Sequence, residues 1–394
     1  MLNLNINKPT ASNQVANQLK RGSYKGTPFF TAGSVTDGFS LDNFSRNSVA
    51  SINSTSGVTL YAADQLRSNS SGMLFESSRE NIFTQSSGNI FTDTGGTITL
   101  TENNGTSPDG TNTLFTLERV SSFPYIFEEF TGITTDEVVS CSCYFSKESS
   151  GSTLFTIWFL NGGTQVQHRV TLNLNSGEIT GTAGSPTNVI VEEVGDFWWI
   201  QFTGTNNSTG NTRLRWTIQP VDTGVTYGIW GYQCEKNSFG SSLIPTSSGA
   251  VTRSADICEL PNSFNKNGTL DGTITLGFKF IHNTPQALFS CGDTTDGLHL
   301  YIDSSQDLTL DIRQSSSSTK IITGVTKNTD YETIITFKND TVRLILDGSE
   351  IGSESSISLD DLGTYTFTLG SSSEVVEDNN FYISKLLLYP YGLL

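Results

Sequence analysis

Alternation of apolar and polar residues is the feature that most restricts how this chain can fold. The clearest case has Val166, His168, Val170, Leu172 and Leu174 on one face, and Gln165, Gln167, Arg169, Thr171 and Asn173 on the other. A period of two is expected of a strand with one buried face. The turn sequences NGG at 161–163 and NSG at 175–177 bound this stretch and predict hairpins on both sides.

The same pattern recurs along the chain. Residues 213–218 alternate Leu214, Trp216 and Ile218 with Arg213, Arg215 and Thr217. Residues 274–280, 298–302 and 308–312 alternate in the same way, and Asp347-Gly348 is a strong hairpin signal. The last strand is apolar on both faces, which predicts a central position in its sheet.

These patterns predict an all-β chain with two β-sandwich domains of the jelly-roll type, preceded by an extended N-terminal arm. The 24 Phe, 12 Tyr and 5 Trp suffice to fill two cores. We predict an arm over residues 1–38, a first sandwich over 39–258 and a second over 259–394, with a turn-rich link at 258–272.

The distribution of charge predicts a role for the arm. The chain has a net charge of −17, yet residues 1–25 contain four basic residues and no acidic one. A basic arm on an acidic protein is expected to dock on another surface. The predicted anchoring residues are Lys20, Arg21, Lys25, Phe29 and Phe30. The alternative for the two phenylalanines is that they cap the adjacent domain.

Several classes of protein are disfavoured by composition. A net charge of −17 without a basic cluster gives no support to nucleic-acid binding. No stretch reaches the roughly 20 apolar residues of a membrane helix, so we expect no membrane insertion. The N-terminus lacks the apolar segment of a secretory signal, which predicts synthesis in a reducing cytoplasm without a signal peptide. The five irregularly spaced cysteines predict neither a disulfide framework nor a zinc site. Cys141 and Cys143 are two residues apart on a strand-like stretch, which predicts small buried residues on one face.

Signs of catalysis are weak, and we assign no catalytic residue and expect no enzyme. The chain has three histidines, and His168 lies on an apolar strand face, as a core histidine does. Neither a G-x-S-x-G elbow nor a metal-binding histidine pair is present. Carboxylates are numerous, so a glycan hydrolase remains a third possibility.

Aromatic side chains are candidates for stacking on sugar rings. The predicted glycan-binding residues are Trp198, Trp199, Tyr125 and Phe127, and further candidates are Trp158, Trp216 and Trp230. Neighbours on a strand point to opposite faces, so one of Trp198 and Trp199 has to face outward. The alternative is burial of that ring under a neighbouring subunit or loop.

No cofactor is expected, with calcium as the one alternative. Asp293 and Asp296 lie in the loop sequence CGDTTDG and offer the hard oxygen ligands that calcium prefers. The alternative is that both carboxylates only form the turn.

Residues 227–256, YGIWGYQCEKNSFGSSLIPTSSGAVTRSAD, resemble the closing segment of a β-sandwich domain common in bacteriophage virion proteins. The matching positions are Trp230, Gly231, Gln233, Glu235, residues 242–246, Thr252, Arg253 and Asp256. Upstream, residues 43–67 resemble the opening of that domain, and residues 72–83 match through Leu74, Glu76, Arg79 and Asn81. The resemblance covers about residues 40–258, and this domain is similar in fold to carbohydrate-binding modules. Residues 262–394 resemble a concanavalin A-like or laminin-G-like jelly roll.

The resemblance implies a bacteriophage virion structural protein, a fibre or spike of the tail. It would join tail, portal or capsid proteins through its arm, assemble as a homo-oligomer, most simply a trimer, and bind host surface polysaccharide. The alternative is a capsid decoration or head-fibre protein without a specific receptor. The resemblance also implies a polar seam in which charged pairs tie the first and last strands together, the other reading being a functional polar site. The seam residues are Arg67, Glu76, Arg79, Arg253 and Asp256.

Overall fold

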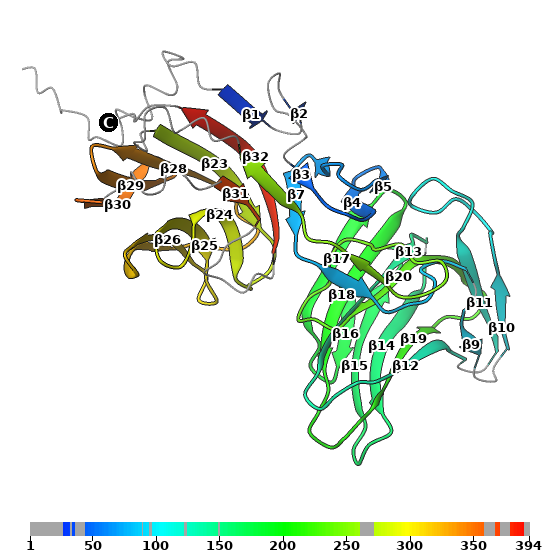
Figure 1. Cartoon of the computed structure of the whole chain (residues 1–394). Helices are drawn as coiled ribbons and strands as arrows, with labels where there is room; N and C mark the ends of the chain where they lie inside the picture. Colours follow the sequence, from blue (N-terminus) through cyan, green and yellow to red (C-terminus); the bar gives the residue numbers. More distant parts are fainter. Residues whose placement is uncertain are drawn as a thin grey trace, which may run out of the picture. The chain divides into compact units, whose positions relative to one another are not determined.

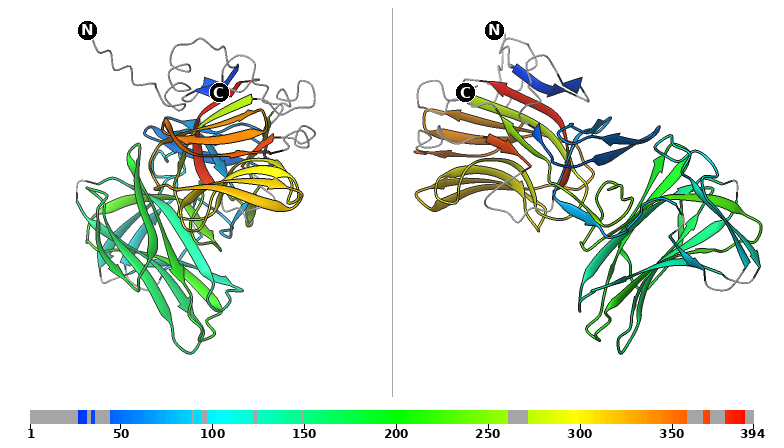
Figure 2. Two further views of the ribbon diagram at one scale, coloured as in Figure 1. Left: turned by 90° about the vertical axis from the view of Figure 1, so that its left-hand side faces the viewer. Right: turned by 45° about the vertical axis from the view of Figure 1, so that its right-hand side comes forward.

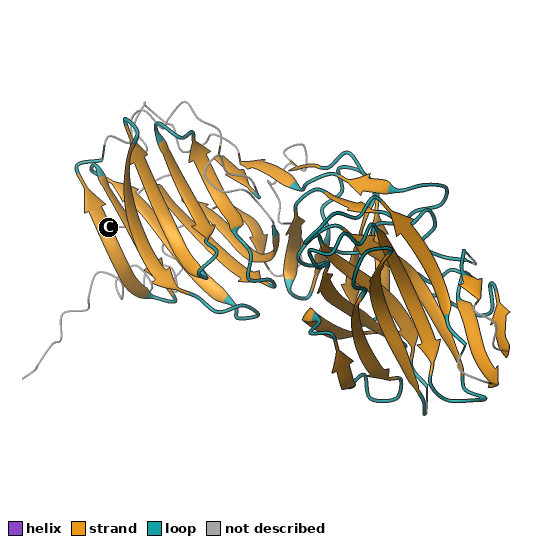
Figure 3. Ribbon diagram, turned by 90° about the horizontal axis from the view of Figure 1, so that it is seen from below, coloured by secondary structure: helices purple, strands orange, loops and turns teal. Residues whose placement is uncertain are grey.

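The described part of the protein consists of β-strands and their connections. The computed structural model describes residues 27–31, 34–35, 44–88, 90–93, 97–121, 124–148, 150–260, 272–357, 367–370 and 379–389. Within these ranges all elements are strands (Figure 3), which confirms the predicted all-β sandwich fold. No described residue lies in a helix long and apolar enough to cross a membrane.

The chain divides into two compact units that are interleaved in sequence. Unit 1 comprises residues 1–46, 64–77 and 255–394, and unit 2 comprises residues 47–63 and 78–254. This division differs from the linear boundaries expected from the sequence. The reason is that residues 72–76 and 257–260 form strands that pair within unit 1, and alternation alone does not say which strand a segment joins.

Unit 1 is a sandwich of two sheets (Figures 1 and 2). The first sheet has the order β2-β1-β32-β23-β28-β29-β30, with β7 also paired to β32 and β6 paired to β7. Its strands are β1 (Thr27–Thr31), β2 (Ser34–Val35), β6 (Ser68–Asn69), β7 (Gly72–Glu76), β23 (Gly272–Phe280), β28 (Tyr331–Lys338), β29 (Thr341–Leu346), β30 (Ser349–Ser355) and β32 (Asn380–Tyr389).

The second sheet of unit 1 has the order β27-β26-β25-β24-β31-β22-β3. Its strands are β3 (Phe44–Ser45), β22 (Ile257–Leu260), β24 (Gln286–Gly292), β25 (Gly297–Ile302), β26 (Asp307–Gln314), β27 (Ser317–Gly324) and β31 (Phe367–Leu369). One apolar core, which includes Phe278, Leu300 and Phe381, draws on both sheets. The Asp347-Gly348 turn has positive φ at both residues, as the predicted hairpin between β29 and β30 requires.

The last strand and part of the predicted arm meet in the first sheet of unit 1. Strand β32 is paired on both edges, with β23 on one side and with β1 and β7 on the other, which confirms its central position. Phe30 in β1 is the register partner of Leu386, so this part of the arm adds a strand to the chain's own sheet. The predicted anchoring residues Lys20, Arg21 and Lys25 lie outside the described residues.

Unit 2 has two six-stranded sheets. One has the order β10-β11-β20-β13-β18-β17, with β10 (Thr97–Thr101), β11 (Phe115–Ser121), β13 (Val138–Ser146), β17 (Thr187–Val194), β18 (Phe197–Thr205) and β20 (Thr226–Glu235). The other has the order β16-β15-β14-β19-β12-β9, with β9 (Thr92–Asp93), β12 (Ile126–Thr131), β14 (Ser152–Leu160), β15 (Val166–Asn173), β16 (Ile179–Ala183) and β19 (Arg213–Pro220). Two short pairs complete it, β4 (Ala50–Ser54) with β5 (Gly57–Tyr61), and β8 (Arg79–Asn81) with β21 (Val251–Arg253).

Two apolar clusters stabilise unit 2. The larger draws on both sheets and contains Trp216, Phe155 and Cys141. All five cysteines of the chain are buried free thiols, which confirms the predicted burial of Cys141 and Cys143, and burial raises the pKa of Cys291 to about 12. The smaller cluster packs on the opposite face of the β18-containing sheet and includes Trp199. Gly231 lies there with φ of +66°, and a Cβ atom at this position would come within 2.6 Å of the Tyr144 ring.

Candidate functional site

The outer face of the β14-containing sheet of unit 2 carries the candidate site. Along β14, Phe155, Ile157 and Phe159 are buried in the core, whereas Trp158 and Leu160 are half-buried on the other face. The alternation therefore places the Trp158 ring on the face turned away from the core. The burial patterns of β15 and β19 confirm the predicted faces, with the polar residues outward on both strands.

Strand register arranges the outward residues in rows. Trp158 is paired with Gln167 of β15 on one side and with Arg215 of β19 on the other. Arg215 is in turn paired with Glu129 of β12. Neighbouring side chains on one face of antiparallel strands lie close enough to act together. The next row holds Arg169, Thr156, Thr217 and Phe127, in that order across the four strands.

These rows enclose a groove of about 730 Å³, within the range of about 300–1,000 Å³ typical of small-molecule sites. Its lining includes Tyr125, Trp158, Gln167, Arg169, Arg215 and Thr217, and we use the term groove for this surface. None of the residues that line it is acidic. The groove thus combines one large aromatic ring with several hydrogen-bond donors.

One side of the groove is held by charge-assisted contacts. The Glu129 carboxylate accepts hydrogen bonds from Arg213 at 2.9 Å and from the Nε of Arg215 at 2.7 Å. The Arg215 guanidinium lies 4.4 Å from the centre of the Phe127 ring and donates to the Tyr125 hydroxyl at 3.3 Å. Because one face and the edge of this guanidinium are in contact with the protein, its position is fixed before any ligand arrives.

Other polar groups of the groove have no protein partner. The Nε of Arg169 and the hydroxyl of Thr217 are buried without a hydrogen bond. The indole N–H of Trp158 and the amide of Gln167 likewise make none within the described part of the chain. Buried polar groups normally find partners, and unsatisfied ones carry a cost in free energy. The Arg169 Nε and the Thr217 hydroxyl are buried beneath the groove surface, so of these four groups the ones left for a ligand are the Trp158 indole and the Gln167 amide.

The glycan-binding residues predicted from the sequence fall in two places. Tyr125 lines the groove, and Phe127 supports its Arg215. Trp199 is buried in the smaller apolar cluster of unit 2, beneath Val58 of β5 and Leu243 of the same chain.

Trp198, on the core side of the same strand, is half-buried and donates its indole N–H to the Leu174 carbonyl at 2.9 Å. Lys147 lies over its ring at 4.8 Å. Neither Trp198 nor Trp199 is therefore an open stacking platform, because the outward-facing ring, Trp199, is covered by the chain itself.

The sequence signal for the groove lay instead in the polar faces of residues 165–173 and 213–219.

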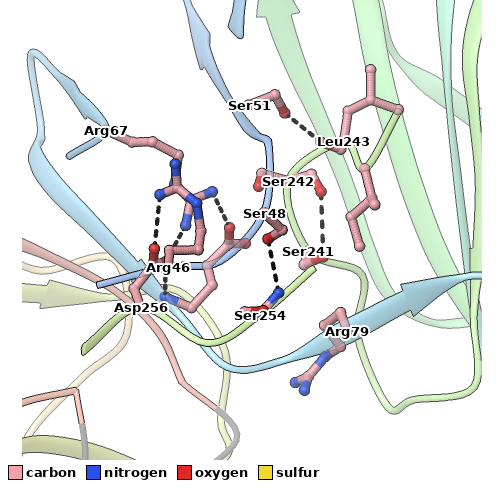
Figure 4. A network of polar contacts seen from close by, with 12 residues as sticks. Arg46, Ser48, Ser51, Arg67, Arg79, Ser241, Ser242, Leu243, Ser254 and Asp256 are labelled. Atoms are coloured by element: carbon pink, nitrogen blue, oxygen red, sulfur yellow. Dashed lines mark hydrogen bonds and ion pairs between the residues drawn. The ribbon is translucent and has the colours of Figure 1, made fainter. Parts of the chain in front are cut away.

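Three of the predicted seam residues come together in unit 1. Arg67 forms an ion pair with Glu76 at 2.5 Å. Asp256 pairs with Arg67 and, at 2.9 Å, with Arg46 (Figure 4). We call Arg46, Arg67, Glu76 and Asp256 the ion cluster. All four side chains are at most 1% exposed. Burial disfavours the charged form of Arg67, but the Asp256 and Glu76 carboxylates outweigh it, and the pKa of Arg67 is raised.

The other two seam residues belong to unit 2. Arg79 lies 3.8 Å from the Glu235 carboxylate and over the Phe239 ring at 4.9 Å. Arg253 is the register partner of Arg79 in the β8–β21 pair. The predicted seam is thus two separate sets of contacts, and Arg46 is a member that no sequence pattern singled out.

The two aspartates considered for calcium form a turn. Asp293 accepts hydrogen bonds from the backbone N–H groups of Thr295 at 2.7 Å and Asp296 at 3.1 Å. Asp296 accepts one from the N–H of Ser315 at 2.7 Å. Among the described residues, no group of three or more His, Cys, Asp or Glu is placed to hold a metal ion. The turn-forming alternative accounts for both side chains.

Comparisons with known proteins give a similarity of fold. No family model and no curated protein matches the chain. The CBM40 module of Ruminococcus gnavus IT-sialidase, solved with α2,3-sialyllactose, is 18% identical and aligns 32% of this chain with 80% of that chain at a TM-score of 0.28. Galectin LEC-6 of Caenorhabditis elegans is 6% identical over 34% of this chain and 88% of that chain, with a TM-score of 0.26.

The binding domain of botulinum neurotoxin DC, solved with rat synaptotagmin II, is 14% identical over 35% of this chain and 36% of that chain, with a TM-score of 0.29. These neighbours are carbohydrate-binding-module and lectin-like β-sandwich folds. Each covers about a third of the chain at a low TM-score. The function therefore has to be inferred from the groove itself.

The ion cluster generates a prediction about stability. Asp256→Asn removes the negative charge that pairs with both Arg46 and Arg67 and leaves one buried positive charge uncompensated. We therefore expect the free energy of unfolding of unit 1 to fall by about 3–5 kcal/mol. The measurement is denaturant unfolding followed by far-UV circular dichroism and by tryptophan fluorescence. All five tryptophans lie in unit 2, so fluorescence follows unit 2 and circular dichroism follows both units.

The matched control within unit 1 is Glu332→Gln, which removes an acid paired with Lys385 at 2.6 Å but 44% exposed. An exposed pair contributes about 1 kcal/mol or less. A loss for Asp256→Asn no larger than that for Glu332→Gln would show that the ion cluster does not stabilise unit 1.

Proposed function

We propose that the groove of unit 2 binds a saccharide. The observation that carries this proposal is the half-buried Trp158 ring in a groove of polar side chains, of which Gln167 and Arg169 make no side-chain hydrogen bond to any described residue. A sugar ring has an apolar C–H face and a rim of hydroxyl groups. The first packs on an aromatic ring, and the second pairs with amides, hydroxyls and guanidinium groups.

The arrangement of the groove favours binding over catalysis. Glycoside hydrolysis uses two carboxyl groups that face the scissile bond. The residues lining the groove include none, and the nearby Glu129 is already bonded to two arginines. The side chains rise from paired strands of a sheet, which holds them in place and lowers the entropy cost of binding.

We further propose that this saccharide-binding protein is a structural component of a bacteriophage particle, most simply a tail fibre or spike. The support is the ordered resemblance of residues 40–258 to a virion β-sandwich domain, together with the basic residues at 1–25 of an otherwise acidic chain. In this role the arm joins other virion proteins, and the groove contacts host surface polysaccharide. A capsid decoration protein is the second candidate, favoured by the same resemblance.

Saccharide binding is tested by replacing the aromatic ring. We expect Trp158→Ala to weaken binding to ligands found on an oligosaccharide array by at least about tenfold, since a central tryptophan often dominates an interface. Trp198→Ala is the matched control, because that ring is also half-buried but lies outside the groove. Titration calorimetry gives the affinities, and thermal unfolding checks that both variants are folded. Equal affinities for Trp158→Ala and the wild type would contradict the proposal.

The virion role is tested by truncation. Removal of residues 1–25 leaves strand β1 in its sheet, so the shortened protein is expected to fold. It is also expected to fail to join particles, since the basic residues of the arm are gone. Incorporation into purified particles, measured by immunoblot against the full-length chain, distinguishes the outcomes. Undiminished incorporation would remove the proposed role of the arm.

A further inference from the structure

We propose that the groove selects acidic saccharides and that Arg169 binds their carboxylate, an inference that rests on the groove being a saccharide site. Three arginines line a groove whose lining contains no acid: Arg169 on β15 at one side of Trp158, and Arg213 and Arg215 on β19 at the other. This concentration of positive charge stands out in a chain with a net charge of −17. An anionic ligand is the chemistry that such a surface fits.

The three arginines are not equivalent. Glu129 lies 2.9 Å from Arg213 and 2.6 Å from Arg215, so one carboxylate is shared between these two guanidinium groups. Arg169 forms no ion pair or hydrogen bond with any described residue, and its buried Nε is unsatisfied. Arg169 is partly exposed, and the terminal nitrogens of its guanidinium, unlike the Nε, are not buried, so they are available to a ligand. Arg213 and Arg215 are already engaged with Glu129.

The position of Arg169 relative to Trp158 fits one sugar unit with an acidic substituent. Trp158 is paired with Gln167, and Arg169 is two residues further along the same strand and face. Such diagonal neighbours lie about 7–8 Å apart in an antiparallel sheet. A ring stacked on Trp158 can thus direct a substituent toward Arg169, while the Gln167 amide meets its hydroxyl groups.

The geometry of the donor favours a carboxylate. Guanidinium and carboxylate are both planar and form two parallel hydrogen bonds, which a lysine at this position would not reproduce. A sulfate ester offers similar oxygens and the same sign of charge, so the two sources of an anion have to be separated by experiment. Partial burial of Arg169 strengthens the pairing, because solvent screens it less.

The experiment uses the full-length protein on an array of carboxylated, sulfated and neutral oligosaccharides, followed by calorimetry with the strongest ligand and its carboxyl-reduced form. We expect carboxylated ligands to bind best and the reduced form to bind at least about tenfold more weakly. Arg169→Gln should cause a similar loss, and Arg169→Lys should restore only part of the affinity. Arg343→Gln, which removes the same charge from a partly exposed pair in unit 1, should leave binding unchanged.

The possible failures are distinguishable. Binding of neutral ligands that is unaffected by Arg169→Gln would overturn the acidic specificity and leave saccharide binding standing. A preference for sulfated ligands that depends on Arg169 would overturn the assignment of a carboxylate. Absence of binding to every saccharide on the array would overturn both the proposed function and this inference.

Discussion

The buried ion cluster of unit 1 joins the segments of the chain at which it passes from one unit to the other, and the fold of unit 1 depends on it. The chain passes between the two units after residues 46, 63, 77 and 254. On the unit 1 side these points lie at or near Arg46, Asp64, Glu76 and Asp256, and Asp64 accepts a hydrogen bond from the backbone N–H of Arg46 at 2.8 Å. Asp256 also accepts the backbone N–H of Glu76 at 2.9 Å. The segments around residues 46, 64–67, 76 and 256 are thus joined at a place from which water is excluded. A buried charge without its partner costs several kcal/mol, so the loss of one member destabilises the whole cluster.

In unit 2 a second network of buried polar side chains connects Asn81 with residues 232–244. This network explains why residues 227–256 contain so distinctive a set of polar residues. Gln233 donates to Glu235 at 2.5 Å and accepts the backbone N–H of Ile244 at 2.6 Å. Asn81 donates to the carbonyls of Tyr232 and Ile244 at 3.1 Å and 3.0 Å. These side chains replace the ladder hydrogen bonds that the irregular loop cannot make, so each is satisfied while buried. The residues that looked like a functional motif therefore hold the end of one sandwich to its beginning.

Much of the local structure could be predicted from the sequence, because strand faces and hairpin turns are short-range properties. The faces around His168 and Trp216, the Asp347-Gly348 turn and the central last strand all follow from alternation or turn chemistry. Pairing between distant strands is not encoded in that pattern. For this reason the groove, which needs β14 between β15 and β19, and the role of Arg46, separated from Asp256 by 210 residues, were not predicted. The burial of Trp199 under a hairpin of its own chain is a further non-local result.

The groove results from strand register, which places Trp158 beside Gln167 and makes Arg169 its diagonal neighbour. The Arg169 side chain has no ion pair or hydrogen bond with any described residue. The most direct test is ¹⁹F NMR of protein labelled with 5-fluorotryptophan, with the five signals assigned by single Trp→Phe variants and an acidic oligosaccharide added stepwise. If the groove is the binding site, the Trp158 signal shifts most, and those of the core residue Trp216 and of Trp230 stay nearly unchanged. A saturable shift of Trp198 with Trp158 unmoved would place the ligand elsewhere and contradict the account.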